Sequence, residues 1–206
     1  MDMMQTTNKA ILCGMPLAEP VFSHISRQER FFSFPLEVAR LSGNVDRLNV
    51  ILREELLRDF SPSRAGLLRI EGELRSFNNR SGEGSRLVIT VFAQELQTPE
   101  TAVWINEVEL IGSLCKPPNH RITPMGREIC DLMVAVNRHY GRSDYLPCIA
   151  WGQSARTAAL WEVGQRVHIL GRIQSRDYVK NLPDGAVTRT AFEVSVTHIQ
   201  PETEDG

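Results

Sequence analysis

The chain has 206 residues and an apolar fraction of 42%, so it has room for one large domain or two small ones around a real core. No run of about 18 apolar residues occurs, which excludes a membrane-spanning helix, and the N-terminus lacks the basic and apolar regions of a signal peptide. The net charge of −2 argues weakly against a nucleic-acid partner, but eleven Lys or Arg and nine Asp or Glu lie in residues 106–199, so a basic surplus lies in the second half.

The first half of the chain predicts five strands separated by turn residues, with one short helix near Glu54–Phe60 between the third and the fourth strand. The last of these strands alternates clearly, with Leu87, Ile89 and Val91 on one face. A Gly-rich turn at residues 78–84 separates it from the strand before it. The predicted strands cover residues 8–14, 30–40, 45–52, 66–77 and 85–96.

The second half repeats the first. Residues 8–14 align with residues 106–112 at a shift of 98, Gly72 pairs with Gly171 at a shift of 99, and the last strands pair at a shift of 103. The shift grows only in predicted loops, as expected for two diverged copies of one fold. The second copy has its predicted helix at Gln153–Leu160, and its predicted strands cover residues 106–113, 127–139, 145–151, 166–178 and 188–199.

Five strands with a helix between the third and the fourth describe a small closed barrel of the OB type. We therefore predict an all-β chain of two tandem five-stranded OB-fold barrels, each with one short helix between strands 3 and 4. The N-terminal barrel covers residues 1–98 and is the more diverged copy, and the C-terminal barrel covers residues 106–200.

The fourth strand of the second copy has two different faces, one apolar and one carrying arginines and a tyrosine. A surface that mixes rings with arginines suits single-stranded nucleic acid, because bases stack on rings at about 1–3 kcal/mol each and basic groups neutralise phosphates. The alternative is that Tyr145 and Trp151, on the neighbouring strand, are core aromatics, and these residues alone leave both interpretations open. The apolar face has Val167, Ile169, Gly171 and Ile173, and the other has His168, Leu170, Arg172, Gln174, Arg176 and Tyr178.

Four segments of the second copy carry a resemblance to a known family. They are NEVELIGSL at the first strand, TPMGREICDLMVAVNR at the second, DYLPCIAWGQSARTAALWEVGQRVHILGRIQSRDY from the third strand to the fourth, and TRTAFEVSVTHIQ at the fifth. In this order and spacing they resemble the bacterial single-stranded DNA-binding protein family over essentially the whole second copy. The first copy is similar in frame but weaker in motif.

The resemblance implies a non-enzymatic, sequence-independent binder of single-stranded DNA in replication, recombination or repair. Members of the family stack bases on four aromatic residues, and the matching positions here are Tyr140, Tyr145, Trp151 and Tyr178. This resemblance favours base stacking over the core interpretation. Arginines near these rings are candidates for phosphate contacts: Arg172 and Arg176 share a face with Tyr178, and Arg138 and Arg142 flank Tyr140.

The first copy departs from this pattern. Its fourth strand carries Glu71 and Glu73 on the matching face, where carboxylates would repel a phosphate backbone. We therefore predict that the first barrel is a weak DNA binder or a structural partner. Its residues at the four aromatic positions are Ser42, Arg47, Arg53 and Asn79.

Members of the family usually end in a flexible segment with an acidic tip and a terminal phenylalanine that recruits other proteins. Only Pro201–Gly206 follows the last predicted strand here, without an aromatic residue, which argues against recruitment through such a tip. The family commonly presents four OB barrels per particle, so two barrels per chain predict a homodimer. The resemblance also implies a cytoplasmic, nucleoid-associated bacterial protein.

The alternative from another functional class is an OB-fold protein-interaction module of a replication-restart or mobile-element complex, because the OB barrel hosts many functions. An enzyme is not expected, because no Gly-rich phosphate loop, HExxH or GxSxG motif occurs. The four cysteines form no CxxC pair and no metal-like cluster with the five histidines. We therefore expect free thiols in a reducing cytoplasm, and no metal or cofactor.

Overall fold

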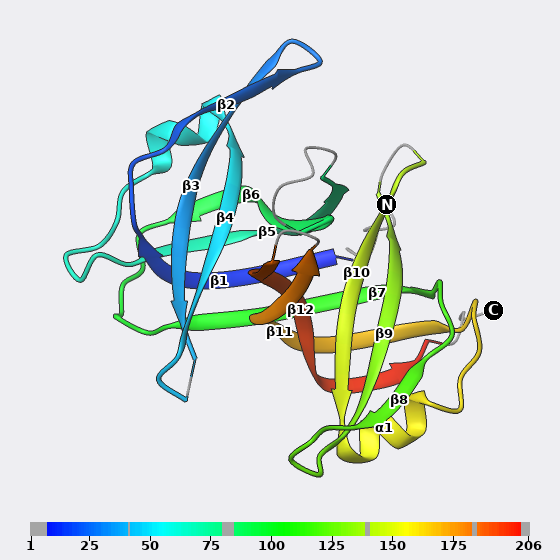
Figure 1. The fold of residues 1–206 in the computed structure, drawn as a ribbon. Helices are drawn as coiled ribbons and strands as arrows, with labels where there is room; N and C mark the ends of the chain where they lie inside the picture. Colours follow the sequence, from blue (N-terminus) through cyan, green and yellow to red (C-terminus); the bar gives the residue numbers. More distant parts are fainter. Residues whose placement is uncertain (1–7, 41, 80–84, 139–140, 183–184, 203–206) are drawn as a thin grey trace. The chain divides into compact units, whose positions relative to one another are not determined.

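The computed structural model describes residues 8–40, 42–79, 85–138, 141–182 and 185–202, and the chain forms two compact units (Figure 1). The N-terminal unit holds residues 9–75 and 89–107. The C-terminal unit holds the described residues from 108 onward, together with Asn8 and with residues 76–79 and 85–88 of the first repeat. The division therefore runs through a hairpin of the first repeat and, near the join between the two predicted domains, between residues 107 and 108.

The first repeat contains the strands β1 (Asn8–Pro16), β2 (Val21–Ser26), β3 (Glu29–Ala39), β4 (Val45–Arg53), β5 (Leu68–Asn78) and β6 (Leu87–Gln97), and a 3-10 helix, η1 (Glu54–Asp59), after β4. Five of these strands close a ring. Strand β1 pairs with β3 and β5, β3 pairs with β4, β4 runs parallel to β6, and β6 lies beside β5.

The second repeat contains β7 (Ile105–Leu114), β8 (Asn119–Ile122), β9 (Glu128–Asn137), β10 (Ser143–Trp151), the helix α1 (Gly152–Ala158), β11 (Arg166–Leu182) and β12 (Gly185–Pro201). Its ring has the same order: β7 pairs with β9 and β11, β9 with β10, β10 in parallel with β12, and β12 with β11. A closed five-stranded ring with a helix between its third and fourth strands is the OB-fold barrel, so the predicted fold is confirmed. Each predicted strand is present, with ends shifted by a few residues.

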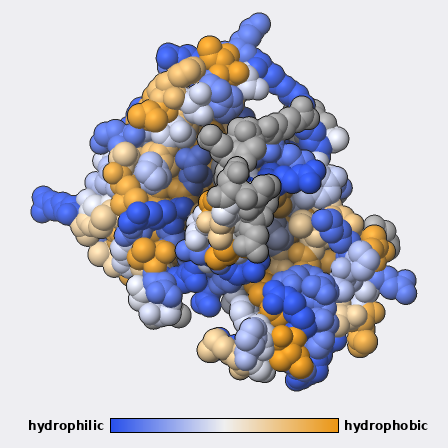
Figure 2. Space-filling view, in the orientation of Figure 1, coloured by the Kyte–Doolittle hydropathy of each residue, from blue (hydrophilic) through white to orange (hydrophobic). Residues whose placement is uncertain are grey.

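The sequence does not predict strands β2 and β8, which pair with β3 and β9 respectively. All six residues of β2 are exposed, so no buried face imposes the alternating pattern that marks the other strands. Figure 2 shows hydrophobic side chains in the region of β2, where Val21, Phe22 and Ile25 are exposed. A short exposed strand of this kind forms by pairing with a longer neighbour.

Alternation decides which side chains enter the core of the C-terminal unit. In β11, Val167, Ile169 and Ile173 are buried, whereas Leu170 is exposed and Arg172 is partly exposed. This confirms the two predicted faces of that strand. The outward side chains of β11 are therefore free of core packing and available for binding.

One glycine pair explains why the two repeats keep the same barrel. A Cβ atom on Gly171 would lie 2.5 Å from the carbonyl oxygen of Ser195, and a Cβ atom on Gly72 would lie 2.1 Å from that of Phe92. Any larger residue would push neighbouring strands apart at these positions. The predicted pairing of Gly72 with Gly171 thus corresponds to one close backbone approach that is present in both barrels.

Candidate nucleic-acid interface

Three adjacent strands of the C-terminal unit carry most of the residues predicted to bind nucleic acid. Strand β10 runs parallel to β12, and β12 is antiparallel to β11. The registers place Ile149, Ser195 and Arg172 side by side across these strands. We call their outward side the aromatic–arginine face, and its residues are Tyr145, Trp151, Arg172, Arg176 and Tyr178.

Tyr145 lies near the start of β10 with half of its surface in solvent. It is 50% exposed, whereas its neighbours Asp144 and Leu146 are fully buried. Its backbone N–H donates a 2.7 Å hydrogen bond to Oγ of Ser76, a residue of the first repeat that belongs to the C-terminal unit. The backbone is therefore held while the ring is open to solvent, which excludes the interpretation of Tyr145 as a core aromatic.

Trp151 ends the same strand and is partly exposed. Its indole N–H donates a 3.1 Å hydrogen bond to Oγ of Ser195 on β12. The chain leaves the strand at Gly152, whose φ of +53° suits glycine and lets α1 begin directly after the tryptophan. The indole is thus fixed in one orientation with part of its surface open, as a stacking platform requires.

Tyr178 lies further along β11, opposite Arg189 of β12, and is partly exposed. Its hydroxyl lies 3.5 Å from Oγ of Ser85, and the Ser85 hydroxyl donates a 2.6 Å hydrogen bond to the carbonyl of Thr190. Ser85 comes from the first repeat and, like Ser76, belongs to the C-terminal unit. The two tyrosines therefore each have a serine of the first repeat beside them.

The two arginines of the face differ in their partners. Nε of Arg172 is buried and has no hydrogen-bond partner among the residues that the structure describes. Nε of Arg176 lies 3.5 Å from Oε2 of Glu193, and the Arg176 side chain is about half exposed. A buried N–H without an acceptor costs free energy. A ligand cannot reach this buried Nε, but the residue as a whole is partly exposed, so Arg172 is a candidate for a phosphate contact.

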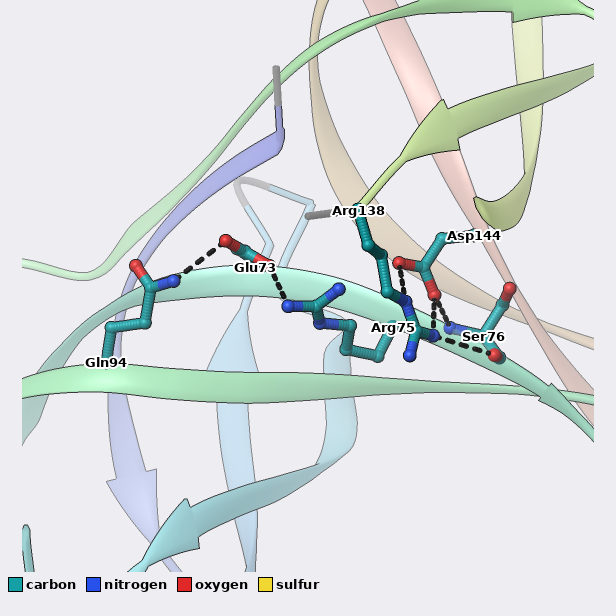
Figure 3. A network of polar contacts seen from close by, with 6 residues as sticks. All are labelled: Glu73, Arg75, Ser76, Gln94, Arg138 and Asp144. Atoms are coloured by element: carbon teal, nitrogen blue, oxygen red, sulfur yellow. Dashed lines mark hydrogen bonds and ion pairs between the residues drawn. The ribbon is translucent and has the colours of Figure 1, made fainter. Parts of the chain in front are cut away.

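The structure gives Arg138 a partner inside the protein (Figure 3). Its Nε donates a 2.6 Å hydrogen bond to Oδ2 of Asp144, and its second guanidinium nitrogen also contacts Oδ1 of Asp144 and, at 3.3 Å, the carbonyl of Ser76. The guanidinium is therefore held by a buried carboxylate. Arg142 is exposed beside it, and Tyr140, which lies between the two arginines in the sequence, is outside the described residues.

Sequence reasoning missed two polar residues of β12 on this face. Ser195 is 4% exposed and holds Trp151, and Glu193 is 8% exposed and accepts a 3.0 Å hydrogen bond from Nε2 of Gln174. The available signal was parity, because Val194 and Val196 point inward and so turn their neighbours outward. Glu193 places one carboxylate among the two arginines, so the face is only moderately basic.

The outward face of the N-terminal unit is built differently. Arg53, at the position that matches Trp151, lies over the ring of Phe92 at 5.3 Å, and Arg75 lies over the same ring at 5.5 Å. Both guanidinium groups also pair with carboxylates, Arg53 with Glu29 at 3.1 Å and Arg75 with Glu73. The Phe92 ring of this face is thus covered by two guanidinium groups, and both of these groups are paired with carboxylates.

No group of three or more His, Cys, Asp or Glu side chains in the described part of the chain gathers closely enough to hold a metal ion. Among the same residues, no helix has the length and apolar character needed to cross a membrane.

Comparison with protein families gives a match to the single-strand binding protein family over residues 105–201, which contains the whole aromatic–arginine face. Two curated relatives are similar over about a third of this chain. Single-stranded DNA-binding protein B of Bacillus subtilis is 36% identical over 80 residues, 35% of this chain and 71% of the relative. Single-stranded DNA-binding protein 3 of Streptococcus agalactiae is 35% identical over 81 residues, and the match spans only 59% of that protein's length.

Solved structures extend the similarity to both units. The wild-type single-stranded DNA binding protein from Thermus aquaticus aligns with 97% of this chain and 94% of its own, with a TM-score of 0.75 and 20% identity. A deletion mutant of the same protein aligns with 97% of this chain and 96% of its own, with a TM-score of 0.74 and 21% identity. At this level of identity the likeness supports the fold.

Proposed function

Because the chain belongs to the single-strand binding protein family, we propose that it binds single-stranded DNA, without sequence preference, on the aromatic–arginine face of its C-terminal unit. The observation that carries the proposal is one face on which Tyr145, Trp151 and Tyr178 are each at least partly exposed, together with the partly exposed Arg172. The protein acts without catalysis, in the cytoplasm on the nucleoid, in DNA replication, recombination or repair.

Stacking supplies most of the affinity. Each base that lies on one of the three described rings contributes about 1–3 kcal/mol. Because Ser195 holds the indole of Trp151 at 3.1 Å, little ordering of that ring remains to be done on binding. Every one of the four bases has a flat face that can stack on a ring, so the binding does not depend on sequence.

Phosphate contacts add a smaller, salt-dependent part. Arg172 and Arg176 lie on the face, and exposed Arg142 precedes Tyr145 on the chain. Each phosphate contact on a single strand contributes about −0.7 to the slope of log K against log salt concentration. Three such contacts give a slope of about −2, so the affinity should fall only moderately with salt. Arg138 is left out of this set because Asp144 holds it.

The test is a titration of a labelled oligo-dT with the full chain, followed by fluorescence anisotropy. We expect the double variant Trp151→Ala, Tyr178→Ala to bind at least about 30-fold more weakly, since two stacking rings are removed. Trp104→Ala is the matched control, because this 38%-exposed tryptophan lies in the N-terminal unit. Wild-type chain that fails to bind at low salt, or a folded double variant that binds as tightly as wild type, would overturn the proposal.

The second candidate is an OB-fold protein-interaction module. The outward face of the N-terminal unit favours it, because the guanidinium groups of Arg53 and Arg75 pair with carboxylates and are not open to phosphates. On the leading proposal this face binds DNA weakly. Arg53→Ala in the full chain should then change the affinity for oligo-dT by less than about threefold. A loss as large as that of the double variant would show that both faces bind DNA.

We also propose that two chains associate, giving four barrels per particle, as the family resemblance implies. The test is the mass of the full chain in solution by light scattering. A mass of two chains is expected, and a mass of one chain over the whole concentration range would contradict the proposal.

A further inference from the structure

We propose that Phe77 of the first repeat is an additional base-stacking residue of the aromatic–arginine face in the C-terminal unit. The inference rests on the proposed function and adds to it a residue that the repeat alignment assigns to the other barrel. By that alignment Phe77 matches Arg176, so it occupies none of the four aromatic positions of the family pattern.

Ser76 fixes the chain at this point. Its N–H donates a 2.6 Å hydrogen bond to Oδ1 of Asp144, its carbonyl accepts from Arg138 at 3.3 Å, and its Oγ accepts from the backbone N–H of Tyr145 at 2.7 Å. Figure 3 shows Ser76 beside both Arg138 and Asp144. Asp144 is fully buried and Ser76 is 9% exposed, so these contacts are enclosed, and the two that involve Asp144 and Arg138 are charge-assisted. The backbone before Phe77 is therefore tied directly to the backbone of Tyr145.

The residues just before β6, in the same hairpin, reach the other tyrosine. The backbone N–H of Asn79 donates a 2.7 Å hydrogen bond to the carbonyl of Arg86, which joins the two strands of the hairpin. Ser85, one residue before Arg86, lies 3.5 Å from the hydroxyl of Tyr178 and donates to the carbonyl of Thr190. The described ends of this hairpin thus touch the aromatic–arginine face at two separate tyrosines.

Phe77 lies between these two contacts with its side chain exposed. Strand alternation turns it away from buried Ser76, and it is 49% exposed, close to the 50% of Tyr145. Consecutive Cα atoms lie about 3.8 Å apart, so the contact through Ser76 keeps the Cα atoms of Phe77 and Tyr145 within about 10 Å. One strand of nucleic acid that stacks on Tyr145 can therefore also reach Phe77.

An exposed phenylalanine is common on proteins and by itself indicates nothing. Phe22 shows the difference, because it is equally exposed at 50% but lies in the N-terminal unit, where Arg30 covers its ring at 5.5 Å. Phe77 instead follows a residue that contacts a predicted stacking tyrosine. Phe22 is therefore the matched control for the loss of an exposed ring.

The test is the same oligo-dT titration with the full chain carrying Phe77→Ala, Phe77→Leu, Phe22→Ala or the double change at Trp151 and Tyr178. We expect Phe77→Ala and Phe77→Leu to weaken binding about 5- to 100-fold, and Phe22→Ala to stay within about twofold of wild type. The leucine variant keeps an apolar side chain without a ring, so it separates stacking from general loss of contact, and thermal unfolding of each variant reports its fold.

Three outcomes would overturn the inference. They are a folded Phe77→Ala or Phe77→Leu chain that binds within twofold of wild type, an equal loss in Phe22→Ala, and a loss in Phe77→Ala that Phe77→Leu fully restores. In each case a weakened double variant at Trp151 and Tyr178 shows that the proposed function stands and that only the role of Phe77 fails. If the double variant also binds as wild type, the proposed function fails as well.

Discussion

The backbone N–H of Ser76 donates a 2.6 Å hydrogen bond to the carboxylate of Asp144, across a sequence separation of 68 residues. Asp144 is fully buried, and the Arg138 guanidinium binds it from the other side. A buried carboxylate is stable only when charge and hydrogen bonds surround it. This single group therefore joins the hairpin of the first repeat to the start of β10, where the aromatic–arginine face begins.

Replacing Asp144 should destabilise the chain more than replacing a similar carboxylate at the surface. Asp144→Asn removes the charge that balances Arg138, and we expect a loss of about 3 kcal/mol, at the lower end for a broken buried pair because Arg138 is about a quarter exposed. Asp131→Asn is the control, since its partner Arg121 is more exposed, and we expect a loss below about 1 kcal/mol. Urea unfolding measures both, and equal losses would show that Asp144 has no special structural role.

The sequence suggests Arg138 as a phosphate contact because it flanks Tyr140, and the structure gives its guanidinium a carboxylate partner, Asp144. Asp144 shares its strand face with buried Leu146, so its parity already places a carboxylate in the interior. A buried carboxylate needs a cation, and Arg138 supplies it. The position of Asp144 on its strand thus indicates an internal partner for Arg138, which the place of Arg138 beside Tyr140 in the sequence does not.

The fold could be predicted because two copies of one pattern support each other and because buried faces leave alternation in the sequence. Strand β2 left no such trace, since both of its faces are exposed. The contacts of Ser76 and Ser85 could not be predicted from the sequence either. They depend on how a hairpin of one repeat meets strands of the other, and no local periodicity records such a contact.

The hydrogen bond from Trp151 to Ser195 should matter for both binding and stability. Ser195→Ala leaves the indole N–H without its partner at 3.1 Å, so the ring is ordered only when a base lies on it. We expect about a two- to fivefold weaker affinity for oligo-dT and a loss of about 1 kcal/mol in unfolding free energy. Ser195→Thr keeps the hydroxyl and should retain most of the affinity, and a Ser195→Ala chain with unchanged affinity would contradict this role.

Gly171 should not tolerate a methyl group. In Gly171→Ala the new Cβ would lie 2.5 Å from the carbonyl oxygen of Ser195, so β11 and β12 must separate, at a cost of about 1–3 kcal/mol. The same shift moves Ser195 and loosens Trp151. Gly126→Ala is a useful comparison, because its Cβ would meet no atom within 4 Å and only its φ of +76° opposes the change. Thermal unfolding should rank Gly171→Ala as the less stable variant, with weaker oligo-dT binding that Gly126→Ala does not share.

The thiol of Cys148 should stay unreactive in the folded chain. Burial in the barrel, and then the nearby carboxylate of Glu193, raise its pKa well above the ordinary range. A raised pKa means that the folded state keeps a proton that the unfolded state loses above about pH 8.5. This stabilisation is therefore complete below about pH 8.5 and is lost progressively at higher pH.

Thiol labelling at pH 8 tests whether the Cys148 thiol is buried and protonated in the folded chain. Cys115, which is only partly buried, should be labelled by a thiol reagent before Cys148, and Cys148 should react only when urea unfolds the chain. In unfolding experiments, the stability of wild type should fall more steeply above pH 8.5 than that of Cys148→Ala, because the variant has no proton to lose at this position. Rapid labelling of Cys148 in the native chain, or identical pH slopes for both proteins, would contradict the buried, protonated thiol.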